Sequence, residues 1–162
     1  MAPEGGPTRI KPKGLADYFE VMTKAVFQSG ISWRVVEAKW DGFRKAFDGF
    51  DPSKVANLTP RDVDRLAEDA SIIRNRRKIE ATVENAETML ALDRKHKGFT
   101  RYLRSHGGFE ETVADLRKRF RFLGDTGCYY FLYVVGEEVP GHERWAESRG
   151  VDPGSMRSKR AR

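Results

Sequence analysis

The stretch LADYFEVMTKAVFQSGISW, residues 15–33, indicates the fold class of this chain more clearly than any other segment. Its apolar residues recur at steps of four, three and four positions: Leu15, Phe19, Met22 and Val26. This spacing is typical of an α-helix with one buried face. The pattern gives way to a short loop at Gly30-Ile31-Ser32, which places Trp33 directly behind the loop.

The same helical spacing continues through much of the remaining chain. Thr59 is followed by Pro60 and, three places after the threonine, by Asp62, which is the pattern of a helix N-cap with proline at the first helical position. We expect amphipathic helices over 36–47, 59–68, 76–92, 99–104 and 109–119.

Residues 126–135 are apolar and aromatic on nearly all sides. This favours a central, fully buried helix, although the tyrosine and valine content leaves a strand open as the alternative. With this segment, the pattern predicts about eight helices. The fold class is therefore expected to be all-α, a single-domain helical bundle.

The composition limits the size and setting of the protein. The 162 residues, 39% apolar and 33% charged, suit one core rather than two domains. The formal charge of +6 favours polyanionic partners. The single cysteine, Cys128, cannot form an internal disulfide, and no apolar run predicts a signal peptide or membrane span. We expect a cytoplasmic monomer without membrane association.

The two ends differ from the middle of the chain. Residues 1–14 are rich in proline and glycine, and residues 151–162 are mostly polar and basic. Neither end has enough apolar surface to offset its ordering entropy. We therefore divide the chain into a flexible N-terminal arm (1–14), a helical domain (15–150) and a basic flexible tail (151–162).

Three segments carry a resemblance to a known family. They are Phe27-Gln28-Ser29-Gly30-Ile31-Ser32-Trp33, Ile72-Ile73-Arg74-Asn75-Arg76-Arg77-Lys78-Ile79, and Phe120-Arg121-Phe122-Leu123-Gly124 with Cys128-Tyr129 behind it. In order and spacing, they resemble the DNA-3-methyladenine glycosylase I family, which belongs to the helix-hairpin-helix DNA glycosylase superfamily. The similarity covers roughly residues 15–136.

The resemblance implies base-excision repair in the bacterial nucleoid. A member would bind double-stranded DNA, flip out a damaged base and hydrolyse the N-glycosidic bond of an alkylated purine such as 3-methyladenine. It also implies a base pocket that contains Gln28, Trp33 and Tyr129, with Ile31 as a wedge in the base stack. An aromatic face such as that of Trp33 suits a flipped, positively charged base.

DNA contacts are expected from the loop at Gly30 and from two other places. Arg74, Arg76, Arg77 and Lys78 gather at the start of a helix, where the helix dipole opposes positive charge, so phosphate contact would compensate them. The hairpin residues Gly124, Thr126 and Gly127 permit a tight turn whose backbone N–H groups face a phosphate. Asp125 would repel that phosphate unless it caps the following helix.

The chain also departs from the family pattern. Ala25 stands where the family carries a glutamate, and the family's zinc-binding cysteines and histidines have no counterparts, so we expect a shortened variant with no metal and no cofactor. Cys128 stands where related strand-cleaving enzymes use a lysine, which predicts a monofunctional enzyme without lyase activity. Of the downstream glutamates, Glu143 is the first candidate for a catalytic carboxylate.

Two alternatives remain open beside the enzyme. One is a degenerate relative that binds DNA or damaged sites without excising a base, which the alanine at position 25 favours. The other is a small helical interaction module whose basic faces are only solvated. A base-release assay on methylated DNA, with a salt titration of DNA binding beside it, distinguishes these three possibilities.

Overall fold

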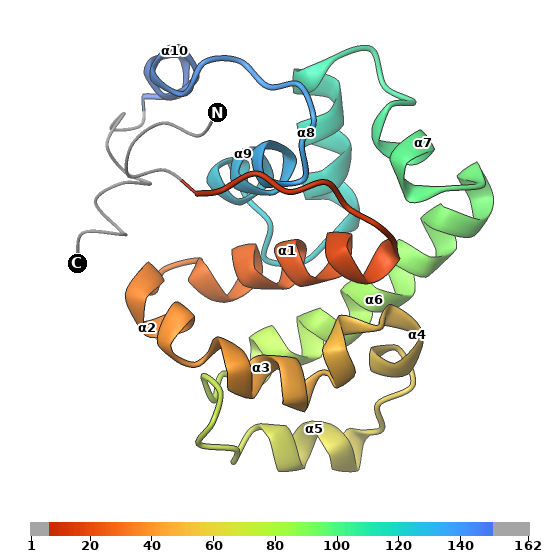
Figure 1. Ribbon diagram of the computed structural model, residues 1–162, viewed down its shortest axis with the longest axis vertical. Helices are drawn as coiled ribbons and strands as arrows, with labels where there is room; N and C mark the ends of the chain where they lie inside the picture. Colours follow the sequence, from red (N-terminus) through yellow and green to blue (C-terminus); the bar gives the residue numbers. More distant parts are fainter. Residues whose placement is uncertain (1–6, 151–162) are drawn as a thin grey trace.

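The computed structural model describes residues 7–150, and all the regular structure within this range is helical (Figure 1). In chain order the elements are α1 (Leu15–Gln28), α2 (Trp33–Ala38), α3 (Trp40–Ala46), the short 3₁₀ helix η1 (Asp48–Phe50), α4 (Pro52–Val55), α5 (Pro60–Leu66), α6 (Arg76–His96), α7 (Phe99–Leu103), α8 (Phe109–Arg119), α9 (Asp125–Val134) and α10 (His142–Ser148). The all-α prediction is confirmed, and residues 126–135 are helical rather than a strand.

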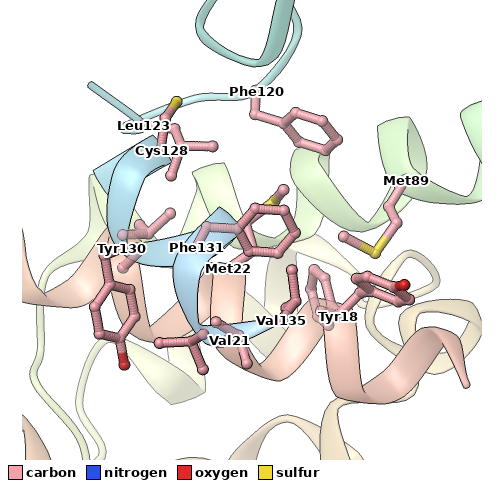
Figure 2. Close-up of a cluster of buried hydrophobic side chains, with 14 of the residues drawn as sticks. Tyr18, Val21, Met22, Met89, Phe120, Leu123, Cys128, Tyr130, Phe131 and Val135 are labelled. Atoms are coloured by element: carbon pink, nitrogen blue, oxygen red, sulfur yellow. The ribbon is translucent and has the colours of Figure 1, made fainter. Parts of the chain in front are cut away.

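Helices α1 and α9 cross at the centre of the molecule, with α6 packed beside α1 (Figure 1). Every side chain of α9 from Cys128 to Val134 is buried, as its apolar sequence predicts. Figure 2 shows Tyr18 and Met22 of α1, Met89 of α6 and Phe131 of α9 meeting in this core. The core thus fixes where the end of α1 lies relative to the start of α9.

An aromatic cluster joins α1 to α3 and η1. The rings of Trp40 and Phe50 stack with centroids 5.1 Å apart, and Phe27 meets Phe43 edge-on at 4.6 Å. The apolar spacing over 36–47 predicted one helix, but the chain turns at Lys39 and forms α2 and α3 instead. With this turn, Val36 of α2 and both Trp40 and Phe43 of α3 are buried.

Two helix ends show how local chemistry sets boundaries. The predicted cap at Thr59 is confirmed, because its hydroxyl oxygen accepts from the Asp62 N–H at 3.2 Å while Asp62 accepts from the Thr59 N–H at 2.9 Å. Helix α6 was expected to stop near residue 92, where the apolar stripe ends. It continues to His96 and stops at Lys97, whose φ of 57° is left-handed.

Residues 7–14, assigned to the flexible arm from composition, cross in front of α9 and run above α1 in the view of Figure 1. The Ile10 N–H donates to the Val134 carbonyl at 2.7 Å, and Arg9 donates to the Glu137 carbonyl at 2.7 Å while it covers the Tyr133 ring. Composition missed these contacts because their partners lie more than a hundred positions away in sequence. The rest of the arm and the basic tail (151–162) lie outside the described residues.

Candidate functional site

A cavity of about 240 Å³ lies where the end of α1, the start of α2 and the start of α9 meet. In liquid water each molecule takes up about 30 Å³, so this cavity is large enough for a small organic molecule. Six residues predicted for the site line it together: Gln28, Gly30, Trp33, Gly124, Thr126 and Gly127. The other lining residues are Pro7, Ala25, Ser29, Phe122, Asp125 and Tyr130.

The loop after α1 forms one wall of this cavity. Gly30 is exposed and adopts a φ of 75°, a left-handed conformation that favours glycine. The Ile31 N–H closes the turn on the Gln28 carbonyl at 3.1 Å, and the chain then enters α2 at Trp33. Ile31 is half-buried against the core and does not line the cavity. Its wedge role remains a prediction.

Gln28 lines the cavity and carries a hydrogen-bond donor that no other described residue uses. Its side chain is 8% exposed, and its Nε2 has no hydrogen-bond partner among residues 7–150. A buried donor without a partner costs about 1–3 kcal/mol. Turning the amide toward an acceptor on a molecule in the cavity would relieve this cost.

The hairpin before α9 forms the opposite wall. A side chain at Gly127 would place its Cβ 3.2 Å from Leu123 Cδ1 and 3.9 Å from the Ala25 methyl carbon, so α1 and α9 approach closely here. Phe122 adopts a φ of 57°, which is uncommon for a bulky residue and costs of order 1 kcal/mol. Such strain is often found at functional sites.

Lys78 corrects the predicted phosphate-binding patch. It was expected to face DNA with its arginine neighbours, but it is only 4% exposed. Its Nζ donates to the carbonyl oxygens of Phe27 at 3.2 Å and Ser29 at 2.5 Å. This places its positive charge at the C-terminal end of α1, where the helix dipole favours a cation. Lys78 therefore holds the cavity loop in place from inside the protein.

The three arginines of the predicted patch are exposed. Arg76 pairs with Asp64 at 2.7 Å, and the Arg77 guanidinium lies 5.9 Å from the centroid of the Phe122 ring, which lines the cavity. Arg74 precedes the helix start at Asn75. Arg77 thus provides positive charge beside the cavity, whereas the charge of Arg76 is paired with Asp64.

Tyr129 does not lie in the cavity, contrary to the prediction. It is buried against Trp145, with ring centroids 4.5 Å apart, and its hydroxyl donates to the Pro140 carbonyl at 2.6 Å. Burial raises the pKa of its hydroxyl, as does the neighbouring Tyr133. Its neighbour Tyr130 lines the cavity instead, because one position along a helix rotates a side chain by about 100°.

Glu143, the first candidate for a catalytic carboxylate, lies away from the cavity. It is exposed on α10, which lies across α9 from α1 and α2 (Figure 1), and it does not line the cavity. The carboxylate that lines the cavity is that of Asp125, in the first turn of α9. The signal for it was its place inside the predicted hairpin, where a carboxylate is hard to reconcile with a phosphate contact.

The one cysteine is a poor candidate for chemistry. Cys128 is fully buried, and burial together with the nearby Asp125 raises the pKa of its thiol to about 12. Within 7–150, no group of three or more histidine, cysteine, aspartate and glutamate side chains could hold a metal ion. The residues present therefore do not fit the family's zinc site, and its absence remains a prediction. No helix in this range is long and apolar enough to cross a membrane.

Comparisons with known proteins identify relatives of this chain. A model of the family described as methyladenine glycosylase matches residues 11–119. The DNA-3-methyladenine glycosylase of Haemophilus influenzae is 33% identical, covering 67% of this chain and 70% of that protein. The DNA-3-methyladenine glycosylase 1 of Escherichia coli is also 33% identical, covering 73% of this chain and 74% of that protein.

Solved structures agree with these sequence matches. The 3-methyladenine DNA glycosylase I of Staphylococcus aureus superimposes with a TM-score of 0.72 at 25% identity, covering 80% of each chain. A single-residue variant of a 3-methyladenine DNA glycosylase I in complex with 3-methyladenine gives a TM-score of 0.67 at 26% identity, covering 82% of this chain and 80% of that one.

Proposed function

This chain belongs to the methyladenine glycosylase family, and from that membership we propose that it excises alkylated adenine, such as 3-methyladenine, from double-stranded DNA. The observation that carries the proposal is the cavity between the end of α1 and the hairpin before α9, with Trp33 and Gln28 in its walls. We further propose that it acts as a monomer in the cytoplasm of a bacterium.

The chemistry suits a cavity whose only lining carboxylate within 7–150 is that of Asp125. A 3-methyladenine base in DNA already carries positive charge, so it leaves as a neutral base without protonation by a general acid. Trp33 would hold the flipped base by stacking and cation–π attraction. Orientation of the base and exclusion of bulk water would then supply much of the acceleration.

The hairpin suits a backbone contact to DNA. Gly124, at the N-cap of α9, has no side chain with which to cap the helix. The first backbone N–H groups of α9 would then donate to a phosphate, which the helix dipole favours, while Arg117 and Arg149 balance the negative charge of Asp125. Such a contact fixes the register of the DNA without reading its sequence.

The test is release of free base from a duplex treated with a methylating agent. The full-length chain is expected to release 3-methyladenine, to leave uracil in a matched duplex, because uracil carries no charge, and to leave the DNA strand uncleaved. Release of no methylated base would overturn the proposal. Strand cleavage would overturn only its monofunctional part.

A binding-only protein is the second candidate, and the alanine at position 25 favours it. Ala25 lines the cavity with a methyl group where the family has a carboxylate. If the chain binds methylated duplex DNA but releases no base from it, this second candidate is the correct function.

Charge reversal of the arginine patch is expected to weaken DNA binding. The double variant Arg74→Glu/Arg77→Glu should lower the slope of log affinity against log salt by about one unit per lost phosphate contact. The control is Arg94→Glu/Lys95→Glu, on exposed residues near the other end of α6, where Lys95 lies roughly 27 Å from Arg77 along the helix. Equal slopes for the two double variants would remove the patch from the interface.

A further inference from the structure

Asp125 is a carboxylate in the cavity wall, and its contacts with other described residues leave part of its hydrogen-bonding capacity free. It is the one acidic residue among the described residues that line the cavity, and it enters the cavity wall from α9 rather than from α1. Its position in the first turn of α9 is favourable, since a helix N-terminus stabilises negative charge. The helix N-terminus therefore explains how the negative charge is stabilised, but it does not explain why an acidic residue lines the cavity.

The ion pairs of Asp125 leave one oxygen able to accept. Arg117 Nη1 donates to Oδ1 at 3.0 Å. The Nε of Arg149 lies 3.6 Å from Oδ2, which is beyond a good hydrogen bond. The Asp125 side chain is 34% exposed, so a ligand can reach it.

Asp125 and Gln28 both line the cavity, and they carry an acceptor and a donor respectively. The carboxylate of Asp125 can only accept when ionised, whereas Gln28 Nε2 is a buried donor without a partner among residues 7–150. Adenine offers the complementary pair on one edge, with a donor at its N6 amino group and an acceptor at N7. Guanine offers acceptors at both O6 and N7 on that edge.

We propose that Asp125 is the specificity-determining residue of this site, selecting alkylated adenine over alkylated guanine. Its carboxylate accepts from the N6 amino group, while the Gln28 amide turns toward the cavity on binding and donates to N7. This inference rests on the proposed function and names its base selectivity. Guanine is rejected because its O6 would face the carboxylate with no hydrogen between the two acceptors. A methyl group at N3 leaves both N6 and N7 free.

The selectivity belongs to binding rather than to bond cleavage. During hydrolysis the C1′–N9 bond breaks and its electron pair neutralises the departing base. Water adds to C1′ and gives a proton to solvent. The charge on the base falls as the bond breaks, so a carboxylate against the base stabilises the bound state more than the transition state. Asp125 should therefore change which base is held more than how fast the bond breaks.

The test compares binding of free 3-methyladenine and free 3-methylguanine to the full-length chain by calorimetric titration. Wild type is expected to prefer 3-methyladenine. Asp125→Asn, which is nearly isosteric but can also donate to O6, should narrow the ratio of the two affinities by about tenfold or more. If the substitution only disturbed the structure, the affinities for both bases would fall equally and their ratio would stay unchanged.

Arg117→Gln is the matched control, because it breaks the closer ion pair and keeps the carboxylate. It should retain the wild-type affinity ratio. The proposal is overturned if Asp125→Asn keeps that ratio, or if Arg117→Gln narrows it as much. The binding ratio is independent of catalysis, so a chain that discriminates the free bases but releases none from DNA would contradict the proposed function and leave this inference standing.

Discussion

Replacing Trp33 with alanine is expected to slow single-turnover release of 3-methyladenine by about 10- to 100-fold. Stacking of a base on an aromatic side chain is worth about 1–3 kcal/mol, and 1.4 kcal/mol corresponds to a factor of ten. Trp33 is half-buried at the first position of α2 and lines the cavity. Trp33→Phe keeps an aromatic face and should retain most of the rate.

The control for this prediction is Val35→Ala, which removes an apolar side chain from the same helix. Val35 is 46% exposed and does not line the cavity, so its variant should release base at the wild-type rate. All variants are compared at saturating enzyme on one methylated duplex. A folded Trp33→Ala protein with full activity would show that the base does not bind against this ring.

The fold was largely predictable because its signals are local. Apolar spacing marks the buried face of α1, and the Thr59 cap marks the start of α5. Helix α10 was missed, since its buried residues are only Trp145 and Ala146. Trp145 packs on Tyr129, which belongs to another helix, α9. Spacing within a segment carries no information about such a partner.

The site was predictable to the segment but not to the side chain. The sequence pointed to the loop at Gln28 to Trp33 and to the hairpin at Gly124, and both line the cavity. It named Tyr129 where Tyr130 lines the cavity, because the direction of each side chain depends on how α9 packs on α1. Asp125 was noticed only as a conflict with phosphate binding.

Lys78 is a second case in which the sequence identified the segment but not the direction of the side chain. Four basic residues in five positions look equivalent in sequence, yet Lys78 alone among them is buried. Burying an ammonium group is costly unless oxygen atoms surround it. The carbonyls at the end of α1 meet that need, and they are contributed by a segment about fifty positions earlier.

Lys78→Met is therefore expected to lower the free energy of unfolding by about 2–4 kcal/mol. Hydrogen bonds from a charged group contribute about 1.5–3 kcal/mol each, and relief of the buried charge offsets part of their loss. The carbonyls of Phe27 and Ser29 would lose this donor, and both flank Gln28 at the cavity. Base release should then fall even at temperatures where the variant is folded.

Urea denaturation measures this loss, with Arg77→Met as the control. Arg77 is the neighbouring cation, but it is exposed, and substitutions at such positions usually change stability by no more than about 0.5 kcal/mol. The two variants remove the same formal charge from adjacent positions of α6, so the difference between them isolates the buried contact with α1. Equal losses of stability would contradict the assigned role of Lys78, because a general effect of charge on the helix start would then explain both.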